Sequence, residues 1–241
     1  MEWFESWFNT PYYHQLYLCR NTDEASVFLH KLLPYLNIPK NSKILDIGCG
    51  KGRHAQIINQ MGFDVTGFDL SEKSIEEAKK LENDHLAFYV HDMRNIFFTN
   101  YFNYAFNLFT SFGYFENERG NIKTLKSTHA GLKKDGILVI DFLNAVKVTK
   151  NLQSDEKKEV GGLVYNIHKY IENNRIIKEI RFNDQGKDFF YVEKVQLLTL
   201  NDFERILTLS GFKIKETFGS YNLEGFTEES DRLIILAEKL A

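Results

Sequence analysis

The chain has 241 residues, of which 43% are hydrophobic, so it can bury the core of one large domain or of a domain with an insertion. A net charge of -3 and the lack of a basic run argue against a nucleic-acid partner. Cys19 and Cys49 lack a metal-ligand spacing, and no basic, apolar leader opens the chain. We therefore expect a reduced, cytoplasmic protein with no metal centre and no membrane segment.

Residues 1–40 are expected to form a helical cap, which begins with an aromatic lead over residues 1–18. Trp3, Phe4, Trp7 and Phe8 would share one side of a helix, and after Pro11 the spacing repeats in a second set of apolar residues, namely Tyr12, Tyr13, Leu16 and Tyr17. A further helix is expected from about residue 22 to Pro34. The aromatic stripe either packs on the core or forms a lid that excludes water from a reacting centre, with Tyr12, Tyr13 or His14 closest to it.

The stretch from Lys43 to Met61 changes from a strand pattern to a helix pattern across three glycines, Gly48, Gly50 and Gly52. Glycine suits a turn that needs open backbone angles and lets a ligand approach the chain. The helix that follows directs free N–H groups at the turn. This pattern predicts a nucleotide-like cofactor close to the backbone of Gly48, Cys49 and Gly50, at the first strand end of an α/β sheet.

Two residues of this stretch argue against a dinucleotide. The G-x-G-x-x-G fingerprint requires a glycine where Arg53 stands, and Asp46 is a better neighbour for an ammonium than for a pyrophosphate. The pattern D-x-G-x-G-x-G resembles motif I of the class I S-adenosylmethionine-dependent methyltransferases. The resemblance implies that S-adenosylmethionine is the cofactor, that Asp46 faces its ammonium, and that Gly52 and Arg53 belong to its site.

Acidic residues follow the next two expected strands, which cover residues 63–69 and 86–91. Asp69, at the carboxyl end of the second strand, is placed to accept the two ribose hydroxyls, and Leu70 would then lie against the adenine. The resemblance assigns Asp92 to the adenine amino group and Met93 to the face of the ring. The alternatives are that Asp69 caps the next helix, as Ser71 could also do, and that Asp92 merely starts a turn.

The fourth expected strand, residues 102–109, ends in Thr110-Ser111-Phe112-Gly113-Tyr114. It lacks the Asn/Asp-Pro-Pro-aromatic tetrad of many amide- and amino-directed methyltransferases, and no cysteine nucleophile is near. Gly113 and Tyr114 resemble the loop at the methionine end of the cofactor, and Leu108 is placed in the same site. A helix over 121–132, a turn at 134–136 and a buried strand over 137–142 are expected next.

The character of the chain changes over residues 144–200. A charged stretch, 153–159, is expected as a mobile loop, and strands are expected over 163–172, 175–182 and 187–199 with hairpin turns between them. We expect an antiparallel accessory sheet over the cofactor crevice that carries much of the choice of acceptor. A helix over 201–210 and strands over 212–221 and 232–238 complete the core. A final antiparallel hairpin resembles the methyltransferase sheet and differs from a dinucleotide-binding domain.

These patterns together predict an α/β fold with a Rossmann-like class I methyltransferase sheet, mostly parallel with an antiparallel last strand, and an antiparallel β insertion. The expected division is an N-terminal cap (1–40), a cofactor-binding core (41–143 and 201–241) and a substrate-side insertion (144–200). We expect methyl transfer to nitrogen or oxygen of a small molecule. A non-catalytic cofactor-binding module and an NAD-dependent oxidoreductase are the alternatives. For a catalytic base we consider His14 first, with Tyr13 beside it, and otherwise His54, His91, His129 and His168. The alternative is that proximity suffices and no residue acts as a base. Tyr13 is also expected to contact the cofactor.

Overall fold

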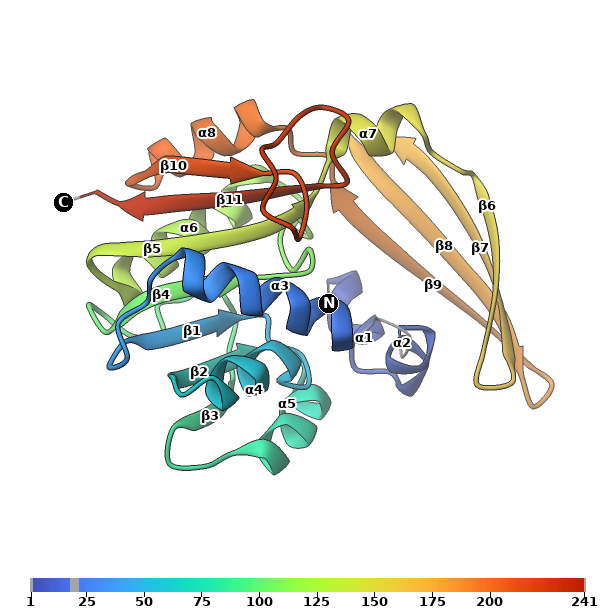
Figure 1. The fold of residues 1–241 in the computed structure, drawn as a ribbon. Coiled ribbons are helices and arrows are strands. Elements are labelled where there is room, and N and C mark those ends of the chain that lie inside the picture. Colours follow the sequence, from blue (N-terminus) through green and yellow to red (C-terminus); the bar gives the residue numbers. More distant parts are fainter. Residues whose placement is uncertain (1, 18–21, 241) are drawn as a thin grey trace.

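The computed structural model describes residues 2–17 and 22–240, so Cys19 lies outside the described part of the chain. Two sheets dominate it: a seven-stranded sheet on the left of Figure 1 and a four-stranded sheet on the right. Two short helices near the N-terminus, α1 and α2, lie between them. In the described ranges, no helix is long and apolar enough to cross a membrane.

The seven-stranded sheet has the order β10-β11-β5-β4-β1-β2-β3. All its neighbouring strands pair in parallel except β11, which runs antiparallel to both β5 and β10. The expected mostly parallel sheet with an antiparallel last strand is therefore confirmed. Its strands are β1 (Lys43–Ile47), β2 (Asp64–Asp69), β3 (Leu86–Val90), β4 (Phe102–Asn107), β5 (Leu132–Leu143), β10 (Phe212–Phe218) and β11 (Arg232–Lys239).

Helices cover both faces of this sheet because its central strands are apolar on both sides. Neighbouring residues such as Ile44 and Leu45 are buried in two separate clusters. Helices α3 (Thr22–Tyr35), α4 (Arg53–Gln60) and α5 (Glu72–Ala78, extended by the 3-10 helix η1, Lys79–Leu81) pack in the first cluster. Helices α6 (Glu118–Gly131) and α8 (Leu200–Leu209) pack in the second. The result is the three-layer arrangement of a doubly wound fold.

The four-stranded antiparallel sheet consists of β6 (Asp155–Val160), β7 (Leu163–Glu172), β8 (Arg175–Asp184) and β9 (Lys187–Gln196). The mobile loop expected over 153–159 is wrong, because this stretch forms β6 and pairs with β7 from Asp155↔His168 to Val160↔Leu163. A charged composition is typical of a loop, but it also suits an edge strand, where charges discourage pairing with other chains. A short helix, α7 (Ala145–Lys150), was also not expected; Asn144 caps it.

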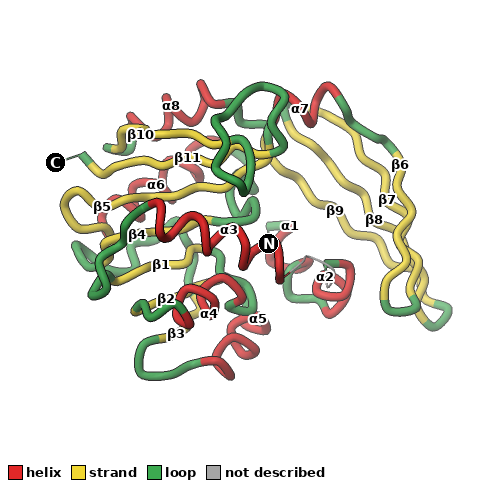
Figure 2. Tube along the Cα trace, viewed as in Figure 1, coloured by secondary structure: helices red, strands yellow, loops and turns green. Residues whose placement is uncertain are grey.

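The turn expected at 134–136 lies within β5, which begins at Leu132. Its pairing with β4 shifts between Phe102↔Leu132 and Tyr104↔Ile137, and Asp135 has φ 59°. The extra residues are therefore accommodated as a bulge at the start of the strand. Figure 2 shows the longer loop between β10 and β11, which runs past the carboxyl end of β5.

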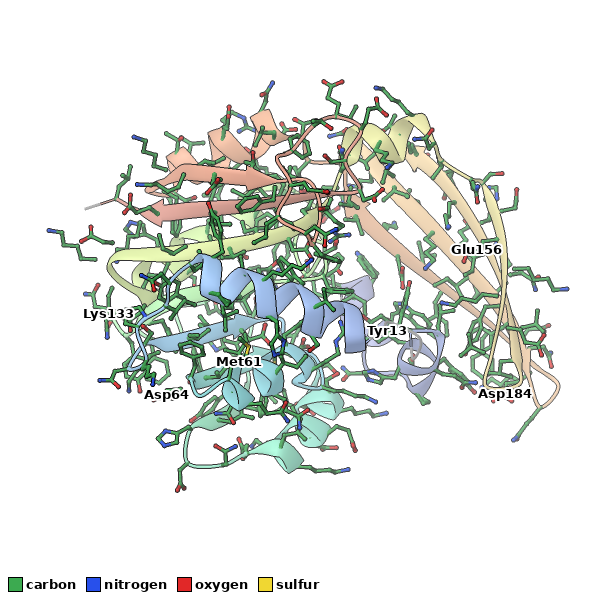
Figure 3. All side chains as sticks on the ribbon, in the orientation of Figure 1. Tyr13, Met61, Asp64, Lys133, Glu156 and Asp184 are labelled. Carbon is green, nitrogen blue, oxygen red and sulfur yellow. The ribbon has the colours of Figure 1, made fainter. Side chains whose placement is uncertain are left out.

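Helices α1 (Trp3–Trp7) and α2 (Pro11–Leu16) pack on the four-stranded sheet through an aromatic cluster that includes Trp7 and Tyr165. The Trp7 indole Nε1 donates to Glu193 at 2.7 Å, and the Tyr12 hydroxyl donates to Asp184 at 2.8 Å. In Figure 3, Asp184 lies at the far end of the sheet, whereas Tyr13 lies on the side of the core. Neighbouring tyrosines on one short helix thus face different parts of the molecule.

Candidate functional site

A cavity of about 500 Å³ lies at the carboxyl ends of the parallel strands β1, β2, β3 and β4. Its size is that of a site for a cofactor-sized ligand. One wall comes from the ends of these strands and the start of α4, and the other comes from aromatic residues of the N-terminal segment. Of the expected cofactor residues, the cavity is lined by Gly48, Cys49, Gly50, Arg53, Asp69, Leu70, Asp92, Met93, Leu108 and Tyr13.

The three glycines of the first turn serve different purposes. At Gly48, with φ +70°, an added Cβ would lie 2.9 Å from the Ser111 Cβ, so close packing requires glycine. At Gly50 an added Cβ would meet nothing within 4 Å, which leaves open space on the cavity side of the turn. Gly52 does not line the cavity. An added Cβ at Gly52 would lie 2.6 Å from the Phe88 ring, so this glycine faces the core. Gly52 therefore serves packing beneath the turn.

Asp69 holds the first turn and the second turn together. Its carboxylate accepts the Gly50 backbone N–H at 2.9 Å and the Ser71 backbone N–H at 2.8 Å. Burial raises the pKa of Asp69, and these backbone hydrogen bonds oppose the rise. Ser71, rather than Asp69, caps α5 by accepting the Ser74 N–H. Asp69 is thus a cavity-lining carboxylate and not a helix cap.

Asp92 is held by a neighbouring arginine. The Arg94 backbone N–H and guanidinium donate to its carboxylate at 2.7 to 3.0 Å, and the same guanidinium pairs with Glu2 at 2.7 Å. Burial alone would raise the pKa of Asp92, but the hydrogen bonds and the charge of Arg94 lower it below its usual value. Asp92 therefore starts a turn and also presents a charged carboxylate to the cavity.

Asp46 lies behind the glycine turn and does not line the cavity. Its side chain is 1% exposed, it accepts the Ala55 backbone N–H, and its Oδ2 has no hydrogen-bond partner among the described residues. Burial raises the pKa of Asp46 to about 7, and the nearby charge of Asp69 contributes to the rise. A buried acid with an unsatisfied oxygen is poised to gain a proton, a water molecule or a cation.

The N-terminal segment lines the opposite wall with Phe4, Phe8, Tyr13, His14 and Tyr17. Tyr12 is not part of this wall, because its hydroxyl is bonded to Asp184 and its ring packs on the four-stranded sheet. Burial lowers the pKa of His14 to about 4, and the charge of Lys51 adds to the effect. The imidazole is therefore neutral at neutral pH.

The end of β4 contributes Leu108, Phe109, Ser111 and Tyr114 to the cavity. The Tyr114 hydroxyl donates to the Thr110 carbonyl, and the Asn107 amide donates to the Ile47 carbonyl at 3.2 Å, so this loop is tied to itself and to β1. Gly113 does not line the cavity, and Phe112 is buried in the core.

The histidines divide clearly. His14, His54 and His91 line the cavity, whereas His129 and His168 do not. His54 is buried beside the Phe109 ring, with ring centroids 5.2 Å apart, and this environment favours a packing role.

Several lining residues escaped the sequence reading. Lys51 lies in the glycine turn, and Ser111 lies in the loop after β4, so their positions in the motifs were a usable signal. No local sequence feature marked the other lining residues, which reach the cavity only through packing: Gln56, Phe68, Ser74, Leu81, Phe109 and Phe115.

The arrangement fits an adenosine-containing cofactor with a positive charge. Carboxylates at the ends of β2 and β3 can accept hydroxyl and amino groups, and Leu70 and Met93 add apolar surface to the same cavity. The open space at Gly50 admits a ligand close to the backbone, and the unsatisfied oxygen of Asp46 lies behind it. In the described part of the chain, no group of three or more His, Cys, Asp or Glu could hold a metal ion.

Known proteins provide an independent comparison. A model of the methyltransferase domain family matches residues 15–217. The putative methyltransferase YqeM of Bacillus subtilis (strain 168) is 25% identical over 84% of this chain and 86% of its own length. The dTDP-3-amino-3,4,6-trideoxy-alpha-D-glucopyranose N,N-dimethyltransferase of Streptomyces venezuelae is 25% identical over 73% of this chain and 78% of its own length.

A crystal structure of an S-adenosylmethionine-dependent methyltransferase from Clostridium acetobutylicum ATCC 824 has the same fold. It superposes with a TM-score of 0.81 at 18% identity, covering 95% of this chain and 96% of its own. The resemblance inferred from the glycine motif is confirmed. The chain belongs to the S-adenosylmethionine-dependent methyltransferases, enzymes whose cofactor is S-adenosylmethionine.

Proposed function

We propose that this enzyme transfers the cofactor's methyl group to a nitrogen or oxygen atom of a small-molecule acceptor. The cofactor supplies a methyl group on a sulfonium, which is already an activated leaving group. The protein therefore has to hold the acceptor in line and to exclude water. One observation carries the proposal: a single cavity has a polar wall from the strand ends and an aromatic wall from α1 and α2.

The strand-end wall is assigned to the cofactor. In this proposal Asp69 accepts the ribose hydroxyls, Asp92 accepts the adenine amino group, and Leu70 and Met93 flank the ring. The backbone of the glycine turn and the Leu108 side chain lie beside the methionine part, and Arg53 is placed to meet its carboxylate. Asp46 acts on the ammonium from behind the turn, through water or through the backbone, because it does not line the cavity.

The aromatic wall is assigned to the acceptor. Phe4, Phe8 and Tyr13 give it large flat surfaces, and Tyr114 of the loop after β4 packs against Phe8 beside them. Such surfaces suit a ring-shaped acceptor with apolar faces. The four-stranded sheet supports this wall rather than forming it: every lining residue among the described ones comes from outside β6 to β9. We propose that the sheet influences acceptor choice through α1 and α2.

An amino group on a sugar-like ring is the acceptor class to test first. The Streptomyces venezuelae relative is named for its action on such a nucleotide-linked amino sugar. His14 is a weak base at neutral pH because its pKa is about 4, so the proposed reaction relies on positioning and not on proton removal by His14. An amine that reaches the site uncharged needs no such base.

The first test is calorimetric titration with S-adenosylmethionine, S-adenosylhomocysteine and NADH. Binding of the first two and not of NADH is the expected result. Methyl transfer is then followed with labelled cofactor on a panel of amino sugars, their nucleotide-linked forms, and phenols. Cofactor binding without transfer to any panel member would contradict the acceptor class, and binding of NADH alone would contradict the proposed cofactor site.

A further inference from the structure

The turn after β4 has an unusual backbone. Phe109 and Thr110 have φ values of +56° and +60°, in the left-handed region that favours glycine. For a bulky residue and a β-branched one in succession, such a conformation persists only if the surroundings hold it. Phe109 lines the cavity, so the backbone that is held here also sets part of the site.

A buried carboxylate on β5 holds this turn. Asp141 is 0% exposed, and its Oδ2 accepts the Phe109 backbone N–H at 2.9 Å and the Tyr221 hydroxyl at 2.9 Å. Its Oδ1 accepts the Arg232 Nε–H at 2.8 Å. The Asp141 backbone carbonyl accepts the Thr110 N–H at 3.0 Å, and Arg232 also donates to the Thr110 hydroxyl at 2.9 Å. Both strained residues are therefore tied to one ion pair, in which the Asp141 carboxylate is fully buried and Arg232 is partly exposed.

This arrangement reaches the cavity through the Phe109 ring. The Arg53 guanidinium lies 4.6 Å from the centroid of that ring, and the Tyr221 ring is stacked on the Phe109 ring with the centroids 5.7 Å apart. Tyr221 in turn packs on Phe28 of α3, at 4.7 Å. The loop between β10 and β11 and a side chain of β5 thus determine where the cavity wall lies at β4.

We propose that Asp141 is a positioning residue. By holding the turn after β4, it places the Phe109 side chain next to the half of the cofactor that lies opposite the nucleoside. The assignment rests on the proposed site, in which Asp69 and Asp92 on β2 and β3 hold the nucleoside. Because β1 lies between β2 and β4 in the sheet, the end of β4 meets the other half of the same ligand. Asp141 contacts no ligand in this proposal; it acts through the turn.

The test compares two ligands that share the nucleoside. Asp141→Asn keeps the shape of the side chain but removes the charge that accepts from Arg232. We expect it to weaken S-adenosylhomocysteine binding about tenfold, the effect of disturbing a buried hydrogen bond to a charged group, and to leave adenosine binding unchanged. Calorimetry measures the first ligand, and saturation-transfer NMR at millimolar concentration measures the second.

A matched pair of tyrosine variants guards against simple misfolding. Tyr221→Phe removes one donor to Asp141 and keeps the ring, so it should weaken S-adenosylhomocysteine binding in the same sense but by less. Tyr165→Phe removes a buried hydroxyl that has no partner among the described residues, far from the turn, and should change neither ligand. If Asp141→Asn does not fold, the difference in S-adenosylhomocysteine affinity between Tyr221→Phe and Tyr165→Phe tests the positioning role instead.

The outcomes separate the inference from the proposed function. Equal loss of both ligands, or no loss of either, in Asp141→Asn would overturn the positioning role. Equal S-adenosylhomocysteine affinity in Tyr221→Phe and Tyr165→Phe would do the same. Failure of the unaltered protein to bind S-adenosylhomocysteine would instead contradict the proposed cofactor site itself.

Discussion

The two walls of the cavity are stabilised in different ways. On the strand-end wall, the carboxylate of Asp69 is fixed by backbone N–H groups of two turns that the parallel sheet itself positions. On the aromatic wall, helices of five and six residues are held by ring packing and by side-chain bonds such as that from Trp7 to Glu193. Helices this short are not stable alone, so their position depends on the four-stranded sheet beneath them.

The difference indicates how the enzyme can vary. A wall built from sheet backbone holds one cofactor and tolerates little change. A wall of packed side chains on a separate support can be altered without disturbing the cofactor site, which suits acceptor recognition. The following substitutions test whether the two walls really are independent.

The largest effect is expected on the aromatic wall. Trp7 is 1% exposed, so Trp7→Ala should lower the free energy of unfolding by about 3–5 kcal/mol. If the walls are independent, the folded fraction should bind S-adenosylhomocysteine within about threefold of normal, a difference below 1 kcal/mol. Chemical denaturation measures the unfolding free energy and calorimetry measures the affinity. A loss of S-adenosylhomocysteine affinity as large as the loss of stability would show that the walls are coupled.

On the strand-end wall, Asp69→Ala should weaken S-adenosylmethionine binding by roughly 2–4 kcal/mol, because two hydroxyl contacts and the anchor of Gly50 are lost. Thr199→Ala is the matched control, since it removes the cap of α8, outside the cavity. The control should lower stability by about 1 kcal/mol and leave affinity unchanged. Unaltered affinity in a folded Asp69→Ala protein would refute the ribose assignment.

The buried acid behind the turn makes stability depend on pH. The pKa of Asp46 is raised by burial from 3.8 to about 7, so the folded state keeps a proton that the unfolded chain releases. This contribution is fully present below about pH 4, declines as pH rises, and is lost above about pH 7. In Asp46→Asn the decline in unfolding free energy between pH 5 and pH 7 should be smaller by about 2 kcal/mol. Identical pH profiles of the two proteins would contradict the raised pKa.

The smallest effect is expected from Glu193→Gln. Glu193 accepts from the Trp7 indole and from the Tyr17 hydroxyl and lies 3.5 Å from the Lys178 ammonium. The amide can still accept one hydrogen bond, so the unfolding free energy should fall by only about 1 kcal/mol. Methyl transfer to an identified acceptor should then show a raised KM for the acceptor and an unchanged KM for the cofactor. A raised KM for the cofactor alone would reverse the assignment of the walls.

The sequence by itself determined the alternation of strands and helices, the glycine turn and the two strand-end acids. These are local features: apolar residues that recur every two or every 3.6 positions, a spacing of glycines, and an acidic residue directly after an apolar run. Asp69 and Asp92, which follow the second and third expected strands, both line the cavity, and their roles toward the cofactor stay predictions. The same local features predicted a loop where the charged strand β6 lies. Its composition is typical of a loop, but pairing with β7 makes it an edge strand.

Only the tertiary structure decided the rest. Gly52 packs on Phe88, Tyr12 faces Asp184 across 172 positions of sequence, and Asp141 reaches Phe109 across 32. Each of these roles depends on which distant side chain arrives beside the residue, and on the burial that removes water there. Pattern and spacing carry no record of such neighbours, because packing and desolvation arise only when the chain has closed on itself.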